Sequence, residues 1–182
     1  MAKVLLHICC GVCAFGSIER LKNEGFYVTG FFYNPNIHPL REYERRRKVL
    51  DTVREKMEIE IIEGVYNPKE WFRLCKDYAC EPEGGARCLV CYKMRLEETL
   101  FLSKKLFFDY FTTTLTISPY KKTGVIFEIG RRLEKEKFLD IDFKKKEGFK
   151  RAKELASKYN VYRQNYCGCV YSLIEKRKKL VK

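Results

Sequence analysis

The sequence predicts an α/β fold, in which one domain of residues 1–182 forms a three-layer structure around a mainly parallel sheet. Segments rich in apolar, β-branched and aromatic residues alternate with helical patterns along the chain, which is typical of a parallel sheet. The first two such segments are joined by one short helix, so their strands should run parallel. A chain of 182 residues is the usual size of one domain, and no repeat, low-complexity tract or linker divides it.

The first half of the chain predicts three strands separated by two helices. Gly25 is a good residue just past the end of the first helix. A turn-rich segment, NPNIHP, precedes the second helix, which has proline at its start. The expected elements are strands over residues 3–8, 27–33 and 59–63 and helices over residues 16–24 and 39–57.

The second half continues the alternation. Asn67 and Pro68 cap a helix with the sequence KEWFRLCKDY, and an EPEGGAR loop over residues 81–87 leads to a long helix over residues 88–106. A strand rich in β-branched residues follows over residues 110–117. The other expected elements are helices over residues 121–137 and 147–159, a short fifth strand over 138–143, an irregular segment over 162–169 and a basic helix over 171–182.

Apolar patterning and cysteine content indicate the cellular compartment of the protein. No apolar run approaches the roughly 18 residues of a membrane span, and the first residues do not resemble a secretory signal. We therefore expect a cytoplasmic protein with no membrane partner. Nine cysteines are many for such a chain, and clustered cysteines in a reducing compartment are typical of metal-binding or catalytic sites rather than of disulfides.

The net charge points to an acidic partner. The chain carries a formal charge of +13 and has a pI near 9.3. Nucleic acid is the first candidate for such a surface. The alternatives are a lysine-rich solvated surface and the high Lys and Glu content of thermophiles.

Seven of the cysteines form three clusters at the ends of expected elements. Cys9, Cys10 and Cys13 lie in the turn after the first strand, where α/β proteins commonly bind ligands. The other clusters are Cys88-x-x-Cys91, at the start of a helix whose positive end lowers thiol pKa values, and Cys167-x-Cys169. This spacing suits zinc and iron–sulfur clusters equally, so metal is indicated without its identity.

The adjacent pair Cys9 and Cys10 indicates two metals or roles. Neighbouring side chains in an extended segment point to opposite sides, so we expect these two thiols not to share one ion. A four-iron cluster or a zinc takes about four ligands, which leaves about three of the seven thiols for a second metal or a redox-active thiol. The other reading is a structural zinc with spare thiols. Cys75 and Cys80 are interpreted as structural.

Other candidate residues have ordinary structural explanations. His7 precedes the cysteines and is interpreted as a core histidine, and His38 as a turn residue. Asp140 and Asp142 can supply a metal ligand or a proton, or can cap a helix or pair with a surface cation. Tyrosines near loop ends, Tyr120 among them, can stack on bases but more often pack in the protein. No Gly-rich dinucleotide motif and no P-loop is present.

Six segments together resemble the QueH-type epoxyqueuosine reductases. They are HxCCxxC, FFYNPNIHP, CxxCYxxRL, TTTLTISPY, DFKKxxG and YRQNYCGCxYS, which occur in order between residues 7 and 172. The familiar form of the first motif has proline before its last cysteine. Here that residue is Val12, a departure that should alter the rigidity of the turn more than metal ligation.

The resemblance implies a reaction, a fold and cofactors. Epoxyqueuosine at the wobble position of a tRNA with a GUN anticodon would lose its epoxide oxygen as water, with two electrons from an unidentified donor. The family uses a [4Fe-4S] cluster with a second mononuclear iron and needs no cobalamin. Its architecture is similar to the HUP-type, Rossmann-like fold of PP-loop ATPases, whose phosphate loop follows the first strand.

The resemblance also implies site residues. All seven clustered thiols are carried over as metal ligands, with Cys10, Cys88, Cys91 and Cys169 assigned to the cluster and Cys9, Cys13 and Cys167 to the second iron. Cys9, Cys13, Asp142 and Tyr120 are the expected catalytic residues, with Asp142 as a further iron ligand or proton donor. The segment over residues 160–182 should close over the site and bring residues 88 and 169 within one cluster's width of residue 10.

Two other functions compete with this hypothesis. An ATP-dependent, PP-loop-like tRNA-thiolation enzyme with a cluster would share the fold, the charge and the cysteines, but it predicts an SGGxDS-like loop after the first strand, which the sequence lacks. A zinc-stabilised RNA-binding module predicts a colourless protein without iron.

Overall fold

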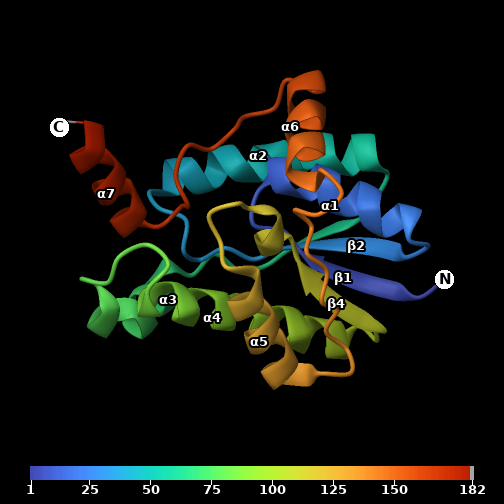
Figure 1. The fold of residues 1–182 in the computed structure, drawn as a ribbon, viewed down its shortest axis with the longest axis horizontal. Helices are drawn as coiled ribbons and strands as arrows, with labels where there is room; N and C mark the ends of the chain where they lie inside the picture. The colour runs from blue at the N-terminus through green and yellow to red at the C-terminus, as the bar shows by residue number, and fades with distance from the viewer. Residues whose placement is uncertain (181–182) are drawn as a thin grey trace.

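The computed structural model describes residues 1–180, with side chains to residue 178, around a four-stranded sheet (Figure 1). Every strand pairing is parallel: Leu5 lies opposite Thr29 on one side and Phe111 on the other. The strands lie in the order β3 (Ile61–Glu63), β2 (Tyr27–Phe32), β1 (Lys3–His7) and β4 (Tyr110–Thr113). The predicted parallel α/β fold is confirmed.

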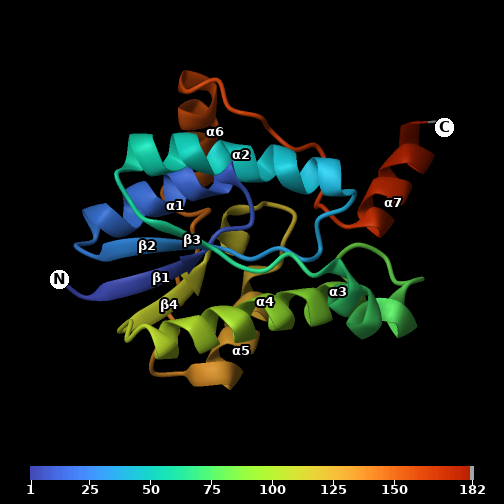
Figure 2. The ribbon, with the colours of Figure 1, turned by 180° about the vertical axis from the view of Figure 1, so that it is seen from behind.

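Helices cover both faces of the sheet and complete the three layers (Figures 1 and 2). One face carries α1 (Gly11–Asn23), α2 (Leu40–Met57) and α6 (Gly148–Lys158). On the other side lie α3 (Pro68–Cys75), the 3₁₀ turn Lys76–Tyr78, α4 (Ala86–Lys105) and α5 (Thr123–Glu134).

Each face of the sheet has its own core because strand side chains alternate in direction. Val4 and Leu6 of β1 pack with α1, α2 and α6, whereas Leu5 packs with α4, α5 and Phe111. All three are fully buried. A strand covered on both faces gives the nearly continuous apolar run at the start of the sequence.

The fifth strand over residues 138–143 was a wrong prediction. Only one bridge forms there, between Phe138 and Phe111. In the residues after Phe138, threonine hydroxyls donate to the backbone carbonyls in place of the backbone N–H groups of a neighbouring strand. Thr112 donates to the carbonyl of Leu139 at 2.9 Å, and Thr116 to that of Ile141 at 2.8 Å. The expected fourth strand is also shorter, because the chain turns into a 3₁₀ helix, Thr114–Ile117, after β4.

Helix α1 starts five residues earlier than expected, immediately after Cys10. Cys10 is its N-cap, and the Cys10 sulfur accepts a hydrogen bond from the backbone N–H of Cys13 at 3.3 Å. Gly11, the first residue of α1, lies against Val49 of α2, where any larger residue would collide with the valine side chain. The cysteine turn is therefore also the place where α1 and α2 pack most closely.

The last part of the chain passes from α6 along α2 to a terminal helix, α7 (Val170–Leu180) (Figure 1). The predicted basic helix is present here, although its last two expected residues, 181–182, lie outside the described residues. Among residues 1–180, no helix is long and apolar enough to cross a membrane.

Candidate metal centre

Three thiols meet in the turn between β1 and α1. The Sγ atom of Cys10 is 3.9 Å from that of Cys9 and 2.6 Å from that of Cys13, and the three sulfurs lie within 4.8 Å of one another. Metal–sulfur bonds of about 2.3 Å in a tetrahedral site place sulfurs about 3.8 Å apart. The distance from Cys9 to Cys10 matches that value, whereas Cys10 and Cys13 lie closer and would have to separate to bind one ion together. Among the described residues, this is the only group of three or more such ligands so close together.

The expectation that Cys9 and Cys10 face opposite sides is therefore wrong. It assumed an extended backbone through both residues, but β1 ends at His7 and Cys10 caps the start of α1. The chain then bends, fixed by Asn34, whose side-chain amide donates to the carbonyl of Ile8 at 2.8 Å. This bend and the N-cap conformation of Cys10 bring the adjacent sulfurs to the same side.

The electrostatics of this turn favour one thiolate. Hydrogen bonds from the Cys10 and Cys13 thiols lower the pKa of Cys9, and the hydroxyl of Thr114 also donates to its sulfur, at 3.2 Å. Burial raises the pKa of Cys10 to about 12, and the hydrogen bond to Cys10 raises that of Cys13. A cation would be needed to bring the other two thiols to the thiolate form at neutral pH.

A second thiol group is buried beneath α3 and α4. Cys75, Cys91 and Cys169 pack together with Trp71 and Met94. Cys169 directly precedes α7, and its sulfur accepts from the backbone N–H of Ser172 at 3.4 Å. In the first turn of α4, the sulfur of Cys88 accepts from the N–H of Gly84 at 3.2 Å. Burial raises the pKa of all four thiols, to about 12 for Cys75 and Cys169.

A cavity of about 660 Å³ opens the first thiol group to solvent. Three cysteines from two distant parts of the chain line it: Cys9 and Cys13 from the turn after β1, and Cys167 from the segment before α7. Five cations also line it: Arg46, Arg95, Lys121, Lys153 and Arg163. Its other polar groups include Glu83 and Tyr120. The cavity therefore exposes sulfur ligands within a strongly basic surround.

A buried ion pair on α2 fixes the segment that carries Cys167. Arg46 is 2% exposed and bonds to Glu42 at 2.8 Å. Its other nitrogens donate to the backbone carbonyls of Cys167 at 2.9 Å and Tyr166 at 3.1 Å. Glu42 also accepts from the hydroxyl of Tyr162 at 2.8 Å. Through its bonds to these two carbonyls, the buried guanidinium holds the C-terminal segment against the cavity.

Comparison with known proteins places the chain in a family. The family described as "QueH: Epoxyqueuosine reductase QueH" matches residues 4–175. The chain belongs to the QueH family. A member from Streptococcus pyogenes serotype M1 named epoxyqueuosine reductase QueH is 39% identical over 93% of this chain and 69% of its own length. The member of the same name from Thermotoga maritima is 38% identical over 98% of this chain and 94% of its own.

A solved structure of low sequence identity has the same fold. It is described as a predicted subunit of tRNA methyltransferase from Methanocaldococcus jannaschii. The TM-score is 0.55 at 14% identity, and the alignment covers 86% of this chain and 75% of the other. This likeness supports the expected Rossmann-like class with a cysteine-rich site at the carboxyl end of β1.

The donor set of this QueH chain fits an anionic metal–thiolate group. Arg95 is 2% exposed and donates to the carbonyl of Cys91 at 3.0 Å, while its Nη2 atom has no hydrogen-bond partner. No carboxylate among the described side chains pairs with it. A buried guanidinium needs a negative partner, and the nearby thiolates supply that charge once a metal binds them.

Of the two predicted non-cysteine residues, the structure brings only one to the cavity. Tyr120 lines it, with 85% of its surface exposed. Asp142 does not line it, and its carboxylate instead accepts from the backbone of Lys144 at 3.1 Å. Glu83 lies in the cavity wall and accepts from the hydroxyl of Ser172 at 3.0 Å, and sequence reasoning missed it. Its place in the EPEGG loop before the C-x-x-C helix was the available signal.

Both histidines are structural, as predicted. His7 is fully buried, and its ring nitrogens bond to the Thr113 hydroxyl at 2.9 Å and to the Tyr33 carbonyl at 3.1 Å. Burial lowers the pKa of His7 to about 3 and that of His38 to about 4. His38 packs between Trp71 and Phe72. Neither ring lies in the cavity wall.

Proposed function

We propose that this protein reduces epoxyqueuosine to queuosine at the wobble position of a tRNA with a GUN anticodon, in the cytoplasm. Two electrons and two protons convert the epoxide to the cyclopentene and release its oxygen as one water. Membership of the QueH family, together with a basic cavity lined by thiols from two distant segments, carries this proposal.

We propose that the seven clustered thiols hold a [4Fe-4S] cluster and a second, mononuclear iron. When bound, these groups would supply single electrons and a Lewis acid for the epoxide oxygen. Cys9, Cys13 and Cys167 are the three thiols in the cavity wall, which supports their assignment to the iron that meets substrate. Cys91 and Cys169 pack together out of the cavity, which supports their assignment, with Cys88, to the cluster.

Cys10 can belong either to the ligands of the cluster or to those of the single iron. It is 1% exposed and absent from the cavity wall, which agrees with a role in the cluster. Its sulfur is also within 4.8 Å of those of Cys9 and Cys13, which agrees with a shared single ion. Mössbauer spectra of a Cys10→Ser variant decide between them, because loss of the cluster signal supports the first and loss of the single-iron signal supports the second.

The chain's own residues would bind the tRNA and move protons. Lys153 and Arg163 lie in the cavity wall, where they can bind phosphates beside the entering nucleotide. Glu83 and Tyr120 are two of the side chains in that wall that can carry a proton, and either can protonate the departing epoxide oxygen. The ion pair of Arg46 and Glu42 holds Cys167 in place for this reaction.

The proposal is tested by anaerobic turnover. Iron-replete protein, epoxyqueuosine-containing tRNA and a chemical reductant, without cobalamin or ATP, should yield queuosine detectable by mass spectrometry of the digested tRNA. No queuosine from iron-replete protein would refute it. A requirement for ATP would instead support the thiolation-type alternative, and a colourless, zinc-only protein would support the RNA-binding module.

A further inference from the structure

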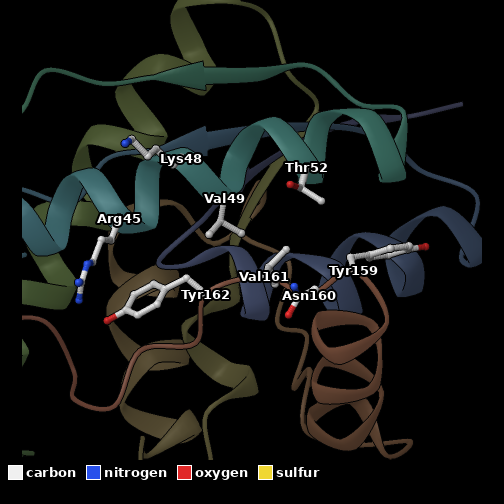
Figure 3. Close-up of a pocket in the computed structure, with 8 residues that line it drawn as sticks. All are labelled: Arg45, Lys48, Val49, Thr52, Tyr159, Asn160, Val161 and Tyr162. Carbon is white, nitrogen blue, oxygen red and sulfur yellow. The ribbon is translucent and has the colours of Figure 1, made fainter.

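An open groove of about 500 Å³ lies beside the cysteine cavity, between α2 and the segment after α6 (Figure 3). The α2 side consists of residues at helical spacing: Arg45, Lys48, Val49 and Thr52. The opposite side is residues 159–162, which are Tyr159, Asn160, Val161 and Tyr162. Val49 and Val161 supply apolar surface, and the other six lining residues carry polar groups.

The same segment of chain lines both depressions. Residues 159–162 line the groove, and residues 163–167 line the cysteine cavity. On α2, Arg45 lies in the groove while the next residue, Arg46, lies in the cavity wall. The groove therefore lies next to the cavity along the same segment of chain.

The groove carries positive charge that the protein does not neutralise. The carboxylates of α2 pair with other cations: Glu42 with Arg46, Glu44 with Arg47, and Asp51 with Arg54. Among the described side chains, no carboxylate forms an ion pair with Arg45 or Lys48. Two exposed, unpaired cations at i and i+3 on one helix face form an anion-binding stripe.

Arg45 is also held in position. Its guanidinium lies 5.6 Å from the centre of the Tyr162 ring. Figure 3 shows these two side chains at the same end of the groove. The hydroxyl of Tyr162 donates a hydrogen bond to Glu42. A cation positioned before its ligand arrives loses less conformational entropy on binding. Thr52 and Asn160 add uncharged hydrogen-bonding groups to the same groove.

We propose that this groove binds the phosphodiester backbone of the anticodon loop next to the nucleotide whose base enters the cysteine cavity. The proposal rests on the function proposed above, because it assigns a binding site to the part of the same tRNA substrate that stays outside the cavity. Arg45 and Lys48 each contact a phosphate, and Thr52 and Asn160 lie within the track of the ribose–phosphate chain. RNA is the occupant because the groove pairs unneutralised cations with hydrogen-bonding groups beside the basic cysteine cavity.

The test measures binding of a fluorescein-labelled anticodon stem-loop to anaerobic holoprotein as a function of salt. The groove variant is Arg45→Ala with Lys48→Ala. The matched control is Lys105→Ala with Lys135→Ala, which removes two exposed, unpaired cations from α4 and the end of α5, on the other side of the sheet.

We expect the groove variant to bind about tenfold more weakly, and its log–log salt slope to fall by about 1.4, since each single-strand phosphate contact contributes about 0.7. The control should stay close to wild type. In turnover assays the groove variant should raise KM and leave kcat unchanged, because neither residue lines the cysteine cavity. Equal losses in the two variants, or no loss in the groove variant, would refute the proposal.

Two further comparisons keep the result interpretable. If the double variant does not fold, Lys48→Ala alone should lower the slope by about 0.7, and an unchanged slope would refute the proposal. Binding does not depend on turnover. A wild-type protein that shows groove-dependent binding but makes no queuosine would sustain the groove and refute the proposed reaction, whereas active protein with a neutral groove variant would refute the groove alone.

Discussion

The two thiol groups differ in how they meet solvent. Cys9 and Cys13 lie at the start of α1 in the wall of a basic cavity, and the pKa of Cys9 is lowered. Cys91 and Cys169 are sealed behind Trp71, and burial raises their pKa values. The cavity wall includes thiols of the first group and none of the second. In the proposed function, the first group meets the substrate and the second holds the cluster.

The largest expected effect is loss of turnover in cysteine variants, and the kind of iron that is lost should differ between the two thiol groups. Cys9→Ser should abolish turnover and lose the mononuclear iron while keeping the cluster. Cys91→Ser should abolish turnover by losing the cluster. Iron analysis and Mössbauer spectra of both anaerobic variants measure this. Retention of both iron signals in Cys9→Ser would remove Cys9 from the ligand set. The control for loss of a thiol in the sealed group is Cys75→Ser, whose activity should change by less than about threefold.

A second comparison tests the proton donor in the cavity wall. Glu83→Gln should lower kcat by about 100-fold, because general acid catalysis typically contributes at least that much. The kcat of Asp142→Asn should stay within about twofold of wild type, because the Asp142 carboxylate pairs with Lys144 outside the cavity. Removing such a partly exposed ion pair typically changes little. Both values come from single-turnover rates at saturating tRNA. A large loss in Asp142→Asn with none in Glu83→Gln would reverse the assignment.

The attachment of the C-terminal segment can be broken on α2. Arg46→Leu leaves the buried carboxylate of Glu42 without its partner, so the free energy of unfolding should fall by about 3 kcal/mol, and iron should be lost with Cys167. Arg47→Leu removes an exposed ion pair and should cost less than about 0.5 kcal/mol. Urea denaturation of the two anaerobic variants measures the contrast. Equal costs would show that the buried pair does not hold the segment.

A smaller effect is expected from pH at the edge of the sealed group. The pKa of His38 is about 4 in the folded protein, below its ordinary value of about 6.5, so the unfolded state binds the proton more readily. The stability contributed by the neutral ring is complete above pH 6.5 and is lost as the pH falls toward 4, by about 1 kcal/mol per pH unit. Between pH 6.5 and 5.5, the free energy of unfolding of His38→Phe should change less than that of the wild type. Denaturation of both proteins at these two pH values measures the difference. Parallel profiles would contradict the account.

Local patterns were enough to predict the parallel sheet and the three cysteine clusters. Apolar runs of β1 and β2, the Asn67 cap and the C-x-x-C helix start depend on neighbouring residues alone. The direction of the Cys10 side chain was not predictable in this way. It depends on where α1 begins, which in turn reflects the packing of Gly11 against Val49, thirty-eight residues later in the chain.

The candidate site shows the same limit. The fifth strand failed because hydroxyls of Thr112 and Thr116 compete for the carbonyls that a ladder would use. Glu83 was missed because its place in the cavity depends on Ser172, which is distant in the sequence. Asp142 was favoured because it lies near a strand-like end, yet the nearer partner was Lys144 two residues on.

The most direct test of the two-centre account is the Mössbauer spectrum of the wild-type protein reconstituted anaerobically with ⁵⁷Fe and sulfide. The account predicts two iron environments in a ratio of about four to one, from a four-iron cluster and a single iron. One environment alone, at full iron loading, would contradict it.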